Sequence, residues 1–134
     1  MKNQSKVILV LEDERPLLEA IKIKLERNDF EVVTARTVEQ AKHYVSELSH
    51  VDAIWLDHYL MGKEDGLDFI AWCKEEDNAK CKQVPVFVVS NTASAEKVST
   101  YMTLGAHKYF VKSNHKLDEI ITEIKDSLFK EPHL

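Results

Sequence analysis

Four short apolar runs in this chain end at side chains that could do chemistry. The residues at these ends are Glu12 with Asp13, then Asp57, Ser90 and Lys112. Clustered carboxylates suit a hard divalent cation, because Mg²⁺ takes one or two carboxylates together with phosphate oxygens and water. A lysine and a hydroxyl opposite them can hold a phosphoryl group while its charge moves. Together these residue types describe phosphoryl transfer to a carboxylate.

Each residue also has a plainer interpretation. The acidic run 12–14 could be a solvated helix start that the helix dipole favours, and Ser90 could be a helix cap. Asp57 could also cap a helix, but the next periodic apolar segment begins only at Leu67, too far along the chain for that cap. Lys112 lies between a strand and a helix start, where burial would require a partner. The chemical interpretation therefore requires that these side chains meet.

The order of the elements predicts where they meet. The expected strands occupy residues 7–11, 31–35, 53–56, 84–89 and 107–111. Strands that are apolar on both faces are typical of a parallel sheet covered on both sides, whereas the more polar second strand is typical of an edge. Five alternations of strand and helix predict an α/β fold with one doubly wound, five-stranded parallel sheet and right-handed crossovers. Ligands bind outside the carboxyl ends of such strands, which lie about 4.8 Å apart, so the polar residues should converge there.

Helical periodicity fills the intervals between these strands. The expected apolar stripes are Leu18, Ile21 and Leu25; Ala41, Tyr44, Val45 and Leu48; Leu67, Ile70 and Cys73 or Lys74; Ala95, Val98 and Met102; and Leu117, Ile120, Ile121, Ile124 and Leu128. Thr37 with Gln40 predicts a capping box, and Gly105 predicts the end of the fourth helix. Asn114 is the expected cap of the last helix.

Composition limits the function further. The 134 residues are expected to form one domain over residues 1–134, with no linker and no attached output domain. Eighteen basic and 23 acidic residues give a net charge of −5, which argues against non-specific nucleic-acid binding. The apolar runs are too short for a signal peptide or a membrane span, so we expect a cytoplasmic protein. Cys73 and Cys81 are expected to be reduced thiols.

The combined pattern resembles the receiver domain of two-component response regulators over essentially the whole chain. The residues that carry the resemblance are Glu12-Asp13, Asp57, Ser90 and Tyr109-x-x-Lys112, with Gly105-Ala106 just before the last of these. Each motif alone is weak, but their joint occurrence at successive strand ends in the right order is specific. The resemblance implies a flavodoxin-like sheet of strand order 2-1-3-4-5.

The resemblance also implies a role for each site residue. Asp57 would accept a phosphoryl group from the phosphohistidine of a sensor histidine kinase or a phosphotransfer protein. Asp13 would bind Mg²⁺ directly, Glu12 would hold it largely through water, and the backbone carbonyl of Tyr59 would supply another ligand. Lys112 would pair with the phosphoryl oxygens. The protein would then be a phosphoacceptor in signalling and not an enzyme.

A switch is implied as well. Ser90 would hydrogen-bond the phosphoryl group and move toward it, and Tyr109 would turn inward from an outward position. The readout surface for an unknown output protein would be formed by the fourth helix, fifth strand and fifth helix. It would include Lys97, Tyr101, Lys108 and Tyr109.

Three positions depart from the family pattern. Met61 stands where a proline is usual, and Gly66 lies one residue later than the usual glycine, so the loop after Asp57 should be one residue longer. Asn91 is larger than the usual residue after Ser90 and could crowd or hydrogen-bond the phosphoryl group. Ser113 replaces a proline that follows a cis bond, and we expect a trans bond here because a cis bond without proline costs roughly 3 kcal/mol.

Three alternatives remain at this level. A flavodoxin-like cofactor-binding protein would need a phosphate-cradling first loop, which the acids at 12–14 would repel, and the chain has no glycine fingerprint there. An aspartyl-phosphatase would need a second acid at the position of Tyr59. A receiver-like scaffold that works without phosphorylation fits the sequence as it stands.

Overall fold

One parallel sheet of five strands forms the centre of the protein. The computed structural model describes residues 5–92 and 94–129. The strands are β1 Val7–Leu11, β2 Glu31–Ala35, β3 Ala53–Leu56, β4 Val86–Ser90 and β5 Lys108–Val111. Their order in the sheet is β2-β1-β3-β4-β5, which confirms the expected flavodoxin-like topology.

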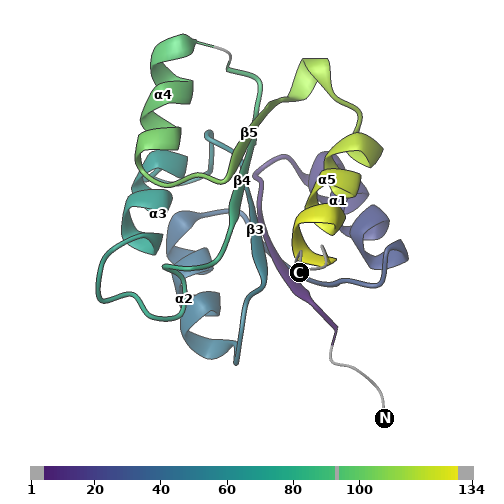
Figure 1. Cartoon of the computed structure of the whole chain (residues 1–134), viewed down its shortest axis with the longest axis horizontal. Helices are drawn as coiled ribbons and strands as arrows, with labels where there is room; N and C mark the ends of the chain where they lie inside the picture. Colours follow the sequence, from purple (N-terminus) through teal and green to yellow (C-terminus); the bar gives the residue numbers. More distant parts are fainter. Residues whose placement is uncertain (1–4, 93, 130–134) are drawn as a thin grey trace, which may run out of the picture.

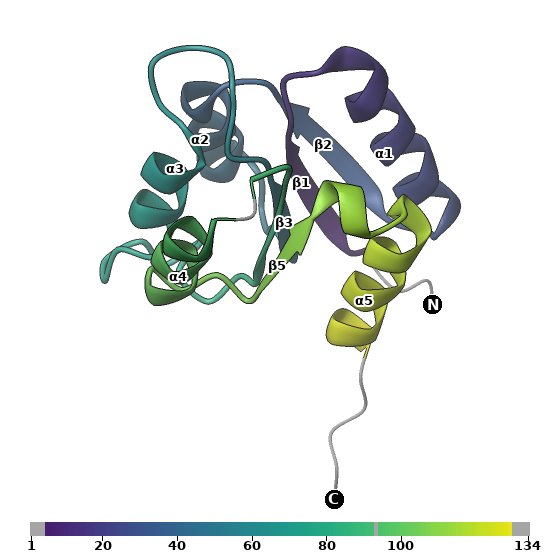
Figure 2. The same ribbon diagram turned by 90° about the horizontal axis from the view of Figure 1, so that it is seen from above.

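Five α-helices cover both faces of this sheet. They are α1 Arg15–Arg27, α2 Val38–Glu47, α3 Gly66–Cys73, α4 Ala95–Thr103 and α5 Leu117–Phe129, and a short 3₁₀-helix, η1, spans Lys112–Asn114. Helices α2, α3 and α4 lie on one face, and α1 and α5 lie on the other (Figures 1 and 2). No helix of the described residues has the length and apolar character needed to cross a membrane.

The apolar runs are explained by two separate cores. Side chains alternate between the faces of a strand, so β3 sends Ile54 and Leu56 toward α2, α3 and α4, and Ala53 and Trp55 toward α1 and α5. All four β3 residues are fully buried. Strand β2, at the edge, keeps its residues 32–34 half-buried, as its more polar sequence predicted.

The register of the strands places their carboxyl ends side by side. Leu11 of β1 pairs with Leu56 of β3, and Leu56 pairs with Val88 of β4. The β1–β3 ladder continues one step further, because the Asp57 amide donates to the Leu11 carbonyl at 3.0 Å. The residues that follow β1 and β3 are therefore neighbours at one edge of the sheet.

Helix α4 is built differently from the expected stripe. Met102 is exposed and Ala95 is exposed, whereas Tyr101 is the buried residue of this helix. The apolar pattern of α4 is weak. The helix packs instead through the Tyr101 ring, whose hydroxyl has a buried hydrogen-bond partner in His58. Tyr101 is also removed from the expected readout surface, because its exposed fraction is 0%.

Two further expectations fail. Asn114 does not cap α5, because it ends η1; the Lys116 amide instead donates to the Glu119 carboxylate at 2.8 Å at the start of the helix. Cys73 and Cys81 are not reduced thiols in the structure but form a disulfide between α3 and the following loop, with their Cα atoms 5.0 Å apart. Their spacing of eight residues gave no sign of this contact, which results from a turn after α3.

Three other local expectations are confirmed in whole or in part. The Thr37 hydroxyl accepts from the Gln40 amide at 3.0 Å and caps α2, but the expected capping box is incomplete, because the Gln40 side chain accepts from the Arg36 amide at 2.8 Å. Gly105 follows α4 with a φ of +109°, a conformation that favours glycine. The bond from Lys112 to Ser113 is trans.

The start of α3 is a close contact that only glycine permits. A Cβ atom on Gly66 would lie 2.7 Å from the carbonyl oxygen of Asp57 and even closer to the hydroxyl of Tyr101. Real Cβ atoms do not approach backbone oxygens so closely. The α3 start, the end of β3 and α4 therefore meet at one point.

We expect Gly66→Ala to lower the free energy of unfolding by more than about 1 kcal/mol, the cost of forcing atoms into a packed interior. Ala71→Gly, at an exposed position of the same helix, should measure the ordinary alanine–glycine difference in a helix. Urea unfolding of both variants gives the comparison. A Gly66→Ala protein as stable as wild type would show that this contact is not tight.

Candidate functional site

Three carboxylates meet at the carboxyl edge of the sheet. Glu12, Asp13 and Asp57 each offer an oxygen, and these oxygens lie within 4.8 Å of one another. Glu12 and Asp57 are buried, whereas Asp13 is half-buried. The donors are all hard oxygens, so the set fits a Mg²⁺ ion better than a metal that prefers nitrogen or sulfur.

Lys112 supplies a positive charge to this cluster. Its Nζ lies 3.0 Å from Glu12 Oε1 and 3.3 Å from Asp57 Oδ2. Lys112 directly follows β5, whereas its two partners follow β1 and β3. The lysine therefore connects the ends of three strands of the sheet. Burial by itself would lower the pKa of Lys112, but the two carboxylates outweigh burial and raise that pKa, so the side chain is a fixed cation.

The two buried carboxyl groups, Glu12 and Asp57, both have raised pKa values. Burial, together with the charge of Asp57, raises the pKa of Glu12 to about 7, although Lys112 opposes the shift. Burial also raises the pKa of Asp57, against the opposing effects of Lys112 and the His58 amide. That amide donates to Asp57 Oδ1 at 2.8 Å, so both carboxylate oxygens of Asp57 have a protein donor.

The remaining predicted residues surround this cluster. Ser90 is fully buried at the end of β4, and its Oγ accepts from the Thr92 amide at 3.4 Å. The Tyr59 side chain is exposed, which leaves only its backbone as a candidate ligand. Asn91 is exposed, and the cap of α3 is Asp65 and not Asp57.

Tyr109, the residue expected to turn between an outward and an inward position, lies in β5. Its ring is half-buried against the core beside Tyr101, with ring centroids 5.7 Å apart. Its hydroxyl donates to the Thr92 carbonyl at 2.8 Å. The hydroxyl therefore has an acceptor on the β4–α4 loop, a contact that the sequence did not reveal.

A second polar group joins the end of β3 to α4. The buried His58 Nδ1 lies 2.6 Å from the Tyr101 hydroxyl, and His58 Nε2 lies 3.1 Å from Lys97 Nζ. Burial and the charge of Lys97 lower the pKa of His58, which favours a neutral ring that donates to Tyr101 and accepts from Lys97. The sequence analysis placed Tyr101 on the readout surface and gave no sign of its contact with His58.

Arg36 is a site residue that sequence reasoning missed. Its guanidinium donates to the backbone carbonyl of Asp13 through Nε at 3.0 Å and Nη2 at 2.7 Å. Two bonds from a planar fork hold the β1–α1 loop in one orientation. A signal was present, since Arg36 directly follows β2 at the same sheet edge as the other polar residues.

Known proteins with similar sequences and structures identify this arrangement. The sequence profile described as the response regulator receiver domain matches residues 8–125. The phosphate regulon transcriptional regulatory protein PhoB of Klebsiella pneumoniae is 33% identical over 118 residues, which are 88% of this chain and 49% of PhoB. The chain spans about half the length of the curated relatives that it matches.

Solved structures agree with this match. The phosphorylated cyanobacterial phytochrome response regulator RcpA has a TM-score of 0.82 and 26% identity, with 98% of this chain and 99% of RcpA covered. The Mn²⁺-bound form of the response regulator Rcp1 has a TM-score of 0.79 and 23% identity, with 96% and 99% covered.

This chain belongs to the response regulator receiver domain family. It is a receiver domain of the two-component type, homologous to the receiver of PhoB. Receiver domains are signalling proteins.

The raised pKa of Glu12 predicts a pH dependence of stability without metal. Between its ordinary value of 4.5 and about 7, the folded protein keeps a proton that the unfolded chain has released. This group therefore stabilises the fold at low pH relative to high pH, by up to about 1.4 kcal/mol per pH unit in that window. Urea unfolding in chelator should show a smaller stability decrease from pH 5 to pH 7.5 in Glu12→Gln than in wild type. Glu14→Gln, at the exposed neighbouring acid, should keep the wild-type slope.

Proposed function

We propose that Asp57 accepts a phosphoryl group from the phosphohistidine of a sensor histidine kinase or a phosphotransfer protein. The observation that carries the proposal is the Lys112 ammonium, which bridges Glu12 and Asp57 inside a cluster of three acids. Such an arrangement is costly for stability alone, because buried like charges repel and the lysine must be desolvated. Membership in the receiver family supports the same role.

The transfer is a displacement at phosphorus. An oxygen of the Asp57 carboxylate attacks the phosphorus atom, a P–O bond forms, the P–N bond to the donor imidazole breaks, and the imidazole keeps the electron pair. Lys112 already lies 3.3 Å from Asp57 Oδ2, so its ammonium can pair with phosphoryl oxygens without a large movement. The Ser90 hydroxyl, buried at the next strand end, would donate to another phosphoryl oxygen.

The same proposal includes a Mg²⁺ ion. Asp13 and Asp57 would bind it directly, Glu12 largely through water, and the Tyr59 carbonyl would complete the protein ligands. Bound Mg²⁺ supplies positive charge that neutralises the entering phosphate. The solved structure of Rcp1, which shares this fold, is of a Mn²⁺-bound form.

Output would pass through the surface of α4, β5 and α5 in the cytoplasm. We propose that Ser90 and Tyr109 transmit the state of Asp57 to this surface and that the protein has no catalytic activity beyond its own phosphorylation and dephosphorylation. The PhoB relatives are transcriptional regulators, and this chain matches about half of their length. We therefore propose that the output surface contacts either a separate output protein or a further segment of the same polypeptide. The domain itself is proposed to extend over residues 1–134.

Labelling with acetyl phosphate tests the phosphoacceptor. Wild-type protein with Mg²⁺ should gain one phosphoryl group, mass mapping should place it on Asp57, and both chelator and Asp57→Asn should abolish the label. Asp52→Asn is a matched control, because that aspartate lies at the opposite end of β3. Absence of any label on wild type, together with unchanged partner binding in Asp57→Asn, would indicate the scaffold alternative.

The repulsion within the acid cluster predicts the behaviour of Asp13→Asn. In chelator this variant should melt at a higher temperature than wild type, because one repelling charge is removed beside Asp57. Wild type should gain about 2.7 kcal/mol when Mg²⁺ is a hundredfold above its dissociation constant, and Asp13→Asn should lose most of that gain.

Glu14→Gln removes an adjacent exposed charge and should retain the full response to Mg²⁺ in the same melting experiment. If Asp13→Asn melts below wild type in chelator and still responds normally to Mg²⁺, Asp13 is a helix-start acid and not a metal ligand.

A further inference from the structure

Arg36 connects two loops on the β2 side of the acid cluster. Its guanidinium donates twice to the Asp13 carbonyl in the β1–α1 loop, at 3.0 Å and 2.7 Å. Its own backbone carbonyl accepts from the Met61 amide in the β3–α3 loop at 3.1 Å, next to a parallel bridge between Met61 and Thr37. One residue therefore holds both of these loops.

Helix α2 holds Arg36 in turn. The Arg36 amide donates to Gln40 Oε1 at 2.8 Å, and Gln40 lies in the first turn of α2, which Thr37 caps. The amide, the carbonyl and the side chain of Arg36 are thus all engaged in hydrogen bonds. The planar guanidinium makes its two bonds in one fixed orientation, so the position of Arg36 also fixes the position of the Asp13 carbonyl.

The two loops carry the ligands that the strands do not place. The Glu12 and Asp57 amides continue the sheet pairing, since they donate to carbonyls of β2 and β1 at 3.1 Å and 3.0 Å. Asp13 lies one residue beyond Glu12, and Tyr59 lies two residues beyond Asp57. The Asp13 carboxylate and the Tyr59 carbonyl therefore depend on the paths of the loops.

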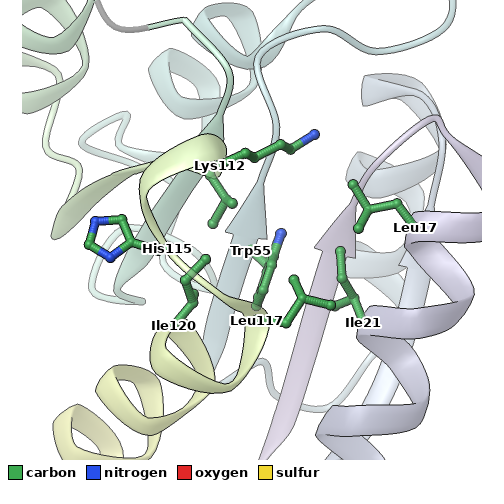
Figure 3. A pocket seen from close by; sticks show the side chains of 8 residues that line it. Leu17, Ile21, Trp55, Lys112, His115, Leu117 and Ile120 are labelled. Atoms are coloured by element: carbon green, nitrogen blue, oxygen red, sulfur yellow. The ribbon is translucent and has the colours of Figure 1, made fainter.

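The other side of the cluster has a different restraint. The Lys112 side chain extends from the end of β5 toward the end of β3, and it forms ion pairs with Glu12 and Asp57 (Figure 3). Its two partners are the acids that the sheet already places. The half-buried Asp13 is instead oriented from the β2 side, through Arg36.

We propose that Arg36 is a positioning residue for the metal site. It holds the loop of the Asp13 carboxylate and the loop of the Tyr59 carbonyl at the spacing that Mg²⁺ requires. Mg²⁺ demands a nearly ideal octahedral geometry, so ligands on two separate loops bind it well only if the loops are fixed relative to each other. The inference rests on the proposed Mg²⁺ site and names a residue that sets its affinity.

Geometry and charge predict opposite effects for the loss of Arg36. The guanidinium brings a positive charge to 2.7 Å from the Asp13 carbonyl, and this charge by itself opposes the binding of a cation. Removal of Arg36 should therefore strengthen Mg²⁺ binding if only its charge matters. It should weaken Mg²⁺ binding if its hydrogen bonds position the ligands.

Titration of the full chain with MgCl₂, followed in ¹H–¹⁵N spectra, measures the dissociation constant of the folded protein. Arg36→Met keeps the aliphatic part of the side chain and removes both bonds to Asp13, so we expect it to bind Mg²⁺ about tenfold more weakly than wild type. Arg15→Met is the matched control, because Arg15 is exposed and lines the same surface hollow as Arg36. This control should bind Mg²⁺ at least as tightly as wild type.

A second pair of variants tests the β3–α3 loop. Met61→Pro removes the amide that donates to the Arg36 carbonyl, and it should weaken Mg²⁺ binding by a smaller factor than Arg36→Met, because it removes one bond and not two. Met61→Ala keeps this amide and changes only an exposed side chain, so it should bind Mg²⁺ as wild type does.

The proposal is overturned if Arg36→Met binds Mg²⁺ as tightly as wild type or more tightly. A purely structural role would give that result together with a lower urea midpoint in chelator. If wild type itself binds no Mg²⁺, the proposed metal site fails and this inference fails with it, whereas equal binding by wild type and Arg36→Met contradicts this inference alone. Should Arg36→Met fail to fold, the two Met61 variants decide the outcome, and equal Mg²⁺ binding by both would overturn the proposal.

Discussion

The rest of the site depends on one unbalanced set of charges. Three carboxylates and one ammonium group meet at the sheet edge, and the nominal sum is −2. Burial of Glu12 and Asp57 makes this excess expensive, which is why their pKa values are raised. The register of the parallel sheet fixes the ends of β1 and β3 as neighbours. The backbone therefore cannot reduce the repulsion between the carboxylates by moving these strand ends apart. A divalent cation has the charge that would balance the set.

Much of this arrangement could be predicted because it follows from strand ends. Apolar runs buried on both faces mark parallel strands, and a polar residue directly after such a run has little choice of position. Strand ends therefore predicted the parallel sheet and the convergence of Glu12, Asp13, Asp57 and Lys112, and the structure brings these four residues together. The order of the strands came from the resemblance to receiver domains, and the structure confirms it. The same rule would have found Arg36 if the more polar β2 had been treated like its neighbours.

The parts that could not be predicted depend on helix packing and loops. A helix face is chosen by its tertiary contacts, and α4 buries Tyr101 because His58 offers its hydroxyl a partner from another element. The disulfide depends on a turn after α3, and the bond from the Tyr109 hydroxyl to the Thr92 carbonyl depends on the path of the β4–α4 loop. Neither path is encoded by a short-range pattern, so periodicity could not indicate them.

The contact among His58, Gly66 and Tyr101 has a consequence for the divergence of this protein. The Tyr101 hydroxyl occupies the space that a side chain on residue 66 would need, and it also satisfies His58 Nδ1. Replacement of any one of the three leaves a clash, a void or an unsatisfied nitrogen. Related sequences should therefore exchange these three positions as a set, and a hybrid that takes β3 from one relative and α4 from another should be viable only when the parents share the same set.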